Sequence, residues 1–155
     1  MLSRTAEYLY WISRYMERAE TTARLLDVGY RMSLFPNPSG YNNEWESVLS
    51  AAGAIEGYKN KYDTIEQKNV EDYLFFDESN PSSVYNCILN ARNNALVVRT
   101  SFTPESWLAI NKTYQEIINL KEKKFTKSDI PDLTEWTIEQ VNLFRGSLSS
   151  LLRND

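Results

Sequence analysis

Residues 3–33, SRTAEYLYWISRYMERAETTARLLDVGYRMS, decide the fold of this chain. From Leu2 onward, apolar residues recur at spacings of three or four, which is the period of one face of an α-helix. They are Leu2, Ala6, Leu9, Ile12, Met16, Ala19, Ala23 and Leu26. Two prolines and a glycine follow within residues 35–40, and they cannot continue the helical hydrogen bonds. The pattern therefore predicts one long N-terminal helix over about residues 3–33.

The same period recurs downstream and predicts five further helices. The second is expected over residues 43–57, and the third begins at Thr64-Ile65-Glu66-Gln67, which fits a capping box. Asn80-Pro81 and Thr103-Pro104 each place an N-cap residue before a proline, so they predict the starts of the fourth and fifth helices. The fourth carries its apolar period to residue 102, and the sixth is expected over residues 133–152.

The sequence shows no alternating runs of β-branched residues bounded by hairpin turns. It also contains no linker and no break in composition. We therefore predict an all-α protein with one domain over residues 1–155, folded as a bundle of about six helices.

Composition excludes several classes of function. The chain has 155 residues, one cysteine and no histidine, which excludes Ser-His and Cys-His nucleophiles and histidine-ligated zinc. Its formal charge of −4 gives no overall attraction to nucleic acid or anionic membranes. The N-terminal stretch has neither a signal-peptide core nor a membrane-spanning length. We expect a cytoplasmic protein with no cofactor and no nucleic-acid or membrane partner, and we expect Cys87 to be a small core residue.

The residues outside the apolar stripe of the first helix form three further strips. At 100° per residue, the aromatic residues Tyr8, Trp11 and Tyr15 lie together on one flank of the stripe. The other flank alternates in sign at spacings of four, three and four, so its side chains are expected to pair. This flank consists of Glu20, Arg24, Asp27 and Arg31, and the remaining strip consists of Arg14, Glu17 and Arg18. Every cation of this helix is arginine, which suits both structural ion pairs and binding of carboxylates or phosphates, and both roles stay open.

Candidate site residues follow from these strips. Glu17 and Glu20, at i and i+3, could act as general acid and base. Dinuclear metal sites in bundles need Glu-x-x-His motifs, so we predict no metal. Arg92 and Arg99, two turns apart on the fourth helix, predict a second polar stripe that is either solvated surface or a ligand contact. The basic run at residues 121–127 is typical of a helix C-terminus, where the dipole favours lysine.

Motifs throughout the chain resemble the bacterial alpha-E domain family, a helical family named for a Glu-Arg motif. The N-terminal motifs are MLSRTAE at 1–7, YW at 10–11, RYMERAE at 14–20 and ARLLD at 23–27. The later ones are NPSS at 80–83, ARNNA at 91–95 with Val98-Arg99, Trp107 with Asn111 and Tyr114, and Phe144-Arg145-Gly146. The resemblance implies a second Glu-Arg copy after the last of these. Residues 1–155 are therefore expected to be the N-terminal half of the family domain or a short member, which favours a homodimer that covers apolar helix faces.

The resemblance also implies a functional context. Alpha-E proteins are encoded beside circularly permuted ATP-grasp proteins and transglutaminase-like peptidases, a system that makes or modifies peptides. Our leading hypothesis is a non-catalytic interaction or scaffold domain that works with the ATP-grasp peptide ligase and holds a partner or an acidic peptide with its first helix. The alternative is half of an enzyme site, with Glu17 or Glu20 as acid or base, arginines as ligand contacts and the second repeat completing it. In a third interpretation the Glu-Arg motif only ties the first helix into the bundle.

Overall fold

The structure, a computed structural model, describes residues 3–35, 43–123 and 129–153, and this part of the chain is all-α. It contains seven α-helices, one 3₁₀ turn and no strand. The elements are α1 (Ser3–Ser33), α2 (Asn43–Ala51), α3 (Ile55–Lys61), α4 (Gln67–Phe75), α5 (Val84–Val97), η1 (Arg99–Ser101), α6 (Pro104–Lys123) and α7 (Ile130–Arg153). The predicted fold class and the long N-terminal helix are confirmed.

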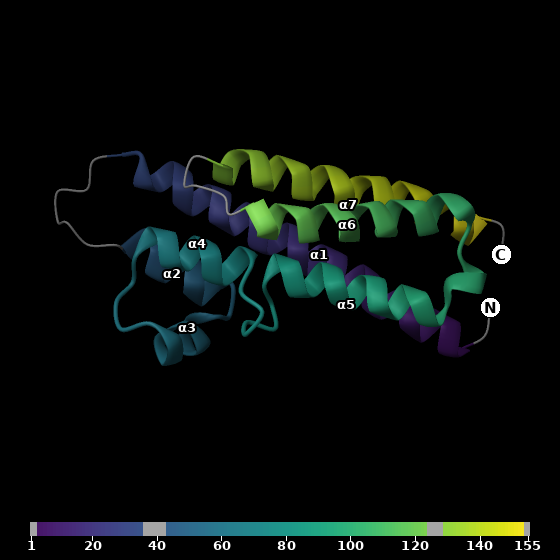
Figure 1. The fold of residues 1–155 in the computed structure, drawn as a ribbon, viewed down its shortest axis with the longest axis horizontal. Coiled ribbons are helices and arrows are strands. Elements are labelled where there is room, and N and C mark those ends of the chain that lie inside the picture. The colour runs from purple at the N-terminus through teal and green to yellow at the C-terminus, as the bar shows by residue number, and fades with distance from the viewer. Residues whose placement is uncertain (1–2, 36–42, 124–128, 154–155) are drawn as a thin grey trace.

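Helix α1 is the central element of the bundle. It packs against α5 and α7 along its length and against α2 and α4 in its C-terminal half. Figure 1 shows the long helices α1, α5, α6 and α7 side by side, with the three short helices gathered at one end. The start of α1 and the end of α7 lie together at the opposite end. One buried cluster includes Leu26, Trp45 and Leu74 near the short helices, and a second includes Ile12 and Phe144 among the long ones.

The predicted second helix is in fact two helices. Gly53 has φ of 67° and interrupts the pattern expected to run to residue 57. The Ala54 amide donates to the Leu49 carbonyl at 2.9 Å and the Gly53 amide donates to the Ser50 carbonyl at 3.0 Å. These two bonds form a Schellman motif, which ends a helix at a left-handed residue that glycine adopts without strain. The chain then turns and α3 begins at Ile55, which raises the number of helices to seven.

Two of the predicted helix starts have different outcomes. The capping box is wrong, because Glu66 is the N-cap of α4 and makes no side-chain capping bond. The Thr64 hydroxyl donates to the Glu66 carboxylate at 3.4 Å instead. The start of α6 is confirmed, since Thr103 Oγ1 accepts a hydrogen bond from the Ser106 amide at 3.2 Å, and Pro104 takes the first helical position.

The predicted N-cap at Asn80 is wrong. Helix α5 begins after Ser83, whose hydroxyl oxygen accepts a hydrogen bond from the Asn86 amide at 3.1 Å. The buried Asn80 side chain donates to the Tyr73 carbonyl at 2.9 Å and accepts from the Ser82 amide at 3.1 Å. Asn80 therefore closes the connection between α4 and α5, and the helix starts only when this turn is complete.

Candidate functional site

The strip of Arg14, Glu17 and Arg18 lies on the exposed side of α1. Arg14 Nη1 is 3.7 Å from Glu17 Oε2, and both side chains are about half exposed, at 52% and 53%. Arg18 forms no ion pair or hydrogen bond within the described ranges 3–35, 43–123 and 129–153. The three residues line a cleft of about 260 Å³ where α1 meets the end of α2. Its other lining residues are Thr21, Thr22, Leu25, Ala51 and Ala52.

The flank of α1 that carries Glu20, Arg24, Asp27 and Arg31 forms the predicted ion pairs. Arg31 Nε lies 2.9 Å from Asp27 Oδ2, and Arg24 Nε lies 3.6 Å from Glu20 Oε2. Glu20 Oε1 also accepts a hydrogen bond from Arg145 Nη1 of α7 at 3.1 Å, and the Glu20 side chain is only 13% exposed. Glu20 thus lies between two guanidinium groups and links α1 to α7, whereas Glu17, about 60° away around the helix, lines the cleft at the end of α2.

Arg92 and Arg99 occupy different surroundings. The Arg92 guanidinium lies 4.4 Å from the centroid of the Tyr114 ring, and its Nε donates to Asn111 Oδ1 at 3.3 Å. Arg92 therefore fastens α5 to α6 through a cation–π contact and a hydrogen bond. Helix α5 ends at Val97, so the exposed Arg99 lies in η1, outside the helix that was expected to carry both arginines.

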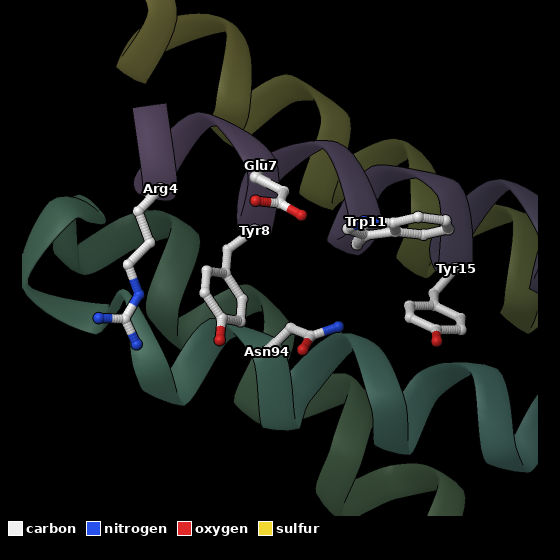
Figure 2. Close-up of a pocket in the computed structure, with 6 residues that line it drawn as sticks. All are labelled: Arg4, Glu7, Tyr8, Trp11, Tyr15 and Asn94. Atoms are coloured by element: carbon white, nitrogen blue, oxygen red, sulfur yellow. The ribbon is translucent and has the colours of Figure 1, made fainter. Parts of the chain in front are cut away.

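A second cleft, of about 560 Å³, lies between the N-terminal half of α1 and α5. Its lining residues are Arg4, Glu7, Tyr8, Trp11 and Tyr15 from α1 and Asn94 from α5 (Figure 2). The sequence predicts that the three aromatic residues share one flank of the first helix, but it does not predict Arg4, Glu7 or Asn94 as site residues. The signal for Arg4 and Glu7 was their helical register, which puts both on the strip that carries Trp11.

Comparison with known families identifies the chain. A family model described as "a predicted alpha-helical domain with a conserved ER motif", Alpha-E, matches residues 1–155. The chain belongs to the Alpha-E family. Neither a curated protein nor a solved structure matches this Alpha-E chain.

The ER motif of this Alpha-E domain is Glu17-Arg18, because these residues form the only Glu-Arg dipeptide in the sequence. Its position on the exposed strip of α1, rather than in the core, is a finding of the structure. The charged heads lie beside the cleft at the end of α2, while the adjacent Ala19 of the apolar stripe is fully buried.

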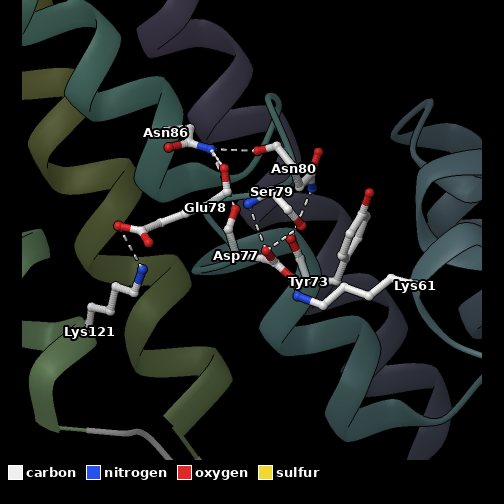
Figure 3. A network of polar contacts seen from close by, with 8 residues as sticks. All are labelled: Lys61, Tyr73, Asp77, Glu78, Ser79, Asn80, Asn86 and Lys121. Carbon is white, nitrogen blue, oxygen red and sulfur yellow. Dashed lines mark hydrogen bonds and ion pairs between the residues drawn. The ribbon is translucent and has the colours of Figure 1, made fainter.

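A polar network fixes the connection that precedes α5 in the Alpha-E fold (Figure 3). The Lys61 ammonium donates to Asp77 Oδ2, and the amide and hydroxyl of Ser79 donate to Asp77 Oδ1 at 2.8 and 2.7 Å. Burial raises the pKa of Asp77, but the hydrogen bonds from Lys61 and Ser79 outweigh it, so the pKa lies below its ordinary value of 3.8. Asn86 donates to the Asn80 carbonyl at 2.8 Å from the start of α5. This network joins α3, the α4–α5 turn and α5.

The first lysine of the basic run has structural partners. Lys121 Nζ lies 3.3 Å from Glu78 Oε1 and 4.3 Å from the centroid of the Tyr85 ring. These contacts join the end of α6 to the α4–α5 turn and to α5 (Figure 3). Residues 124–127 of the run lie outside the described residues.

Other chemistry within the described residues is limited. Cys87 is fully buried, as predicted, and burial raises the pKa of its thiol to about 12, which keeps the thiol protonated. No group of three or more cysteine, aspartate or glutamate side chains in the described ranges is placed to hold a metal ion. None of the described helices combines the length and apolar character needed to cross a bilayer.

Proposed function

We propose that this Alpha-E chain is a non-catalytic interaction domain that works in the cytoplasm with a circularly permuted ATP-grasp peptide ligase and a transglutaminase-like peptidase. In this proposal the strip of Arg14, Glu17 and Arg18 contacts the ligase during peptide synthesis or modification. The observation that carries the proposal is the position of Glu17-Arg18. Both side chains are exposed, and Arg18 has no ion-pair partner in the described part of the chain. Contacts that hold the bundle together do not occupy Arg18.

The exposed face of α1 has the composition of a protein-binding surface. Tyr10, Arg14, Thr21, Val28 and Met32 fall within about 60° of one another on the helix, and all are exposed. Tyrosine and arginine are among the residues that contribute most to binding at protein interfaces. An arginine beside a shallow cleft also suits a carboxylate of an acidic surface or peptide. These features support a protein or acidic peptide as the bound partner.

Light scattering on a sizing column tests the proposal with the chain alone and mixed with the ATP-grasp protein encoded nearest to it. We expect a joint complex that is lost in the double variant Glu17→Ala/Arg18→Ala, while the helical signal and the melting temperature are retained. The matched control is Lys112→Ala/Glu139→Ala, which removes one exposed acid and one exposed base from α6 and α7 and should leave the complex intact.

Other outcomes of this experiment would reject the proposal. If the wild-type chain does not bind the ligase, the ligase is not its partner. If the double variant still forms the complex, Glu17 and Arg18 are not the contact. If the double variant unfolds, the motif has a structural role.

A second copy of the chain is a further proposed partner. Val28 and Met32, one turn apart near the C-terminal end of α1, are 50% and 52% exposed, and Phe35, just after the helix, is 74% exposed. A contiguous exposed apolar area favours association. The same light-scattering run on the chain alone gives its mass, and a monomer at all concentrations would reject the homodimer.

The enzyme alternative depends mainly on Glu17. The two arginines around Glu20 hold its carboxylate in ion pairs, whereas Glu17 is half exposed beside a cleft with Arg14. An exposed carboxylate next to an arginine that can bind an anion is the arrangement that such a site needs. Turnover of a nucleotide or peptide by a chain that carries the second repeat, lost on Glu17→Gln, would favour this alternative over the interaction domain.

A further inference from the structure

The cleft between α1 and α5 has distinct chemistry along its length. Figure 2 shows Arg4 at one end, Tyr8 and Asn94 in the middle, and Trp11 and Tyr15 toward the other end. Its volume of about 560 Å³ lies within the range of small-molecule and peptide pockets. The cleft therefore offers a cation at one end, polar groups that include the Glu7 carboxylate in the middle, and aromatic rings at the other end.

Within residues 3–35, 43–123 and 129–153, the charged groups of the cleft form no ion pair. Arg4 and Glu7 stand at i and i+3, a spacing that often gives an ion pair, yet neither forms one within the described residues. The Arg4 guanidinium lies 5.9 Å from the centroid of the Tyr8 ring instead. Both charges are exposed at the same cleft and are available to a ligand.

The aromatic side chains at the other end of the cleft are accessible to solvent. Trp11 is 45% exposed, and its ring centroid lies 6.4 Å from that of Tyr15, with the planes tilted by 42°. Tyr10 packs its ring edge-on against Trp11 at 5.4 Å from outside the cleft and limits the movement of the indole. An exposed tryptophan held by a neighbouring ring can pack against an apolar or aromatic side chain.

We propose that this cleft binds the last three or four residues of a peptide with a free C-terminal carboxylate. The carboxylate pairs with Arg4, and an apolar or aromatic side chain packs against Trp11 and Tyr15. The Asn94 side-chain amide, which can both donate and accept, hydrogen-bonds the peptide backbone between them. Glu7 accepts from a peptide N–H or a basic side chain.

Spacing along α1 selects a ligand of this length. Arg4 and Trp11 are seven residues apart, which corresponds to about 10.5 Å along the helix axis. An extended peptide covers about 3.3–3.6 Å per residue, so about three residues span the two ends. A free amino acid is too short to reach both ends. A polyphosphate would meet only one arginine and would be repelled by Glu7.

This inference goes beyond the proposed function, because the peptide cleft and the cleft beside Arg14, Glu17 and Arg18 share no lining residue. The two proposals can therefore fail separately. Variants at Trp11 and Arg4 test the cleft, and the ligase complex depends on the other strip.

The test is a titration of the 155-residue chain with acetyl-Ala-Phe-Ala-Ala, followed by NMR at the indole N–H of Trp11 and by calorimetry. We expect saturable binding of the free acid and at least tenfold weaker binding of the same peptide with a C-terminal amide. Trp11→Ala should lose binding, and Arg4→Gln should bind the acid and the amide equally. Lys112→Gln is the control, since this exposed residue does not line the cleft and should leave binding unchanged.

Four results would overturn this inference. They are no saturable shift of the Trp11 signal with the free acid, equal binding of acid and amide by the wild type, full binding by Trp11→Ala, and an acid preference that persists in Arg4→Gln. Circular dichroism verifies that each variant keeps its helices. If Trp11→Ala does not fold, the response of Arg4→Gln still decides the carboxylate contact.

Discussion

Replacing Asp77 by alanine should destabilise the fold by about 1.5–3 kcal/mol, because it removes the acceptor of three hydrogen bonds. A hydrogen bond to a charged group contributes about 1.5–3 kcal/mol to stability. The Lys61 side chain is 45% exposed, so water can hydrate its ammonium group when Asp77 is lost, and its bond contributes little. Most of the loss therefore comes from the buried carboxylate and its bonds to Ser79. For a domain of this size the melting temperature should fall by roughly 4–10 °C.

The pH dependence of this loss has a definite sign. The pKa of Asp77 in the folded chain lies below the ordinary 3.8, so the carboxylate contributes its full stability above that pH and loses it as the pH falls through the lowered value. The pKa of Lys61 is raised above 10.5 by the hydrogen bond to Asp77, so its share is present below that pH and disappears as the pH rises through the raised value. The difference between wild type and Asp77→Ala should shrink below pH 3.8.

Urea unfolding near neutral pH and at about pH 3 measures both effects. Glu78→Ala is the matched control, because Glu78 is the adjacent carboxylate, is 68% exposed and, among the described residues, has Lys121 at 3.3 Å as its one ion-pair partner. Its loss should cost less than about 1 kcal/mol. A difference for Asp77→Ala that is as large at pH 3 as at neutral pH would refute the argument, as would a Lys61→Met variant that costs as much as Asp77→Ala.

Three further predictions test the packing around α1. Gly29→Ala should destabilise by about 1–3 kcal/mol in urea, despite the better helix propensity of alanine, because the new Cβ would lie 2.7 Å from Trp45 Cζ3. The Cys87 thiol should resist a disulfide reagent at neutral pH until the chain unfolds, because its pKa is about 12, and rapid labelling of the native chain would contradict its burial. Thr134→Val should cost about 1 kcal/mol on thermal unfolding, because the buried hydroxyl donates to the Ala23 carbonyl at 3.1 Å, and an unchanged melting temperature would show that this bond is dispensable.

The helices could be predicted from sequence where a long period was uninterrupted. In the sequence, the apolar stripe of helix α1 continues over about seven turns, from Leu2 to Leu26, and the bounds of the helix at residues 3–33 agree with the prediction. The break at Gly53 could not be foreseen in the same way. A single glycine inside a helical period is tolerated, and its positive φ depends on the Schellman bonds that form only in the folded turn.

Two helix starts with the same local sequence signal show that such a signal alone does not decide where a helix begins. Thr103-Pro104 was sufficient because the hydrogen bonds of the Thr103 hydroxyl with the amide and the hydroxyl of Ser106 both lie at the start of α6 itself. Asn80-Pro81 carries the same signal, but the side-chain amide of Asn80 donates a hydrogen bond to the Tyr73 carbonyl and does not cap the helix. A side chain that can cap a helix can also close a turn, and only the tertiary position of the preceding helix decides which bond forms.

The candidate site could be predicted only within one helix. The pairs Glu20–Arg24 and Asp27–Arg31 follow from a spacing of four residues and are present. Arg145 is 125 residues away from Glu20, and no local pattern relates them. Asn94 joins the aromatic flank of α1 for the same reason, because only the packing of α5 against α1 brings it to the cleft.

Both proposed surfaces depend on how the circumference of α1 is divided. Its buried stripe packs against the bundle, one flank is joined to α7 through Glu20 and Arg145, and the other flank forms the cleft with α5. Because α1 is held on both sides, its remaining strip is fixed in orientation, and the rotamer-rich arginines lose less freedom when a partner binds. Breaking the Glu20–Arg145 contact should therefore weaken a partner held by Arg14, Glu17 and Arg18 without touching that strip. A Glu20→Ala variant with wild-type affinity for the ligase would show that the α1–α7 contact does not position the binding surface.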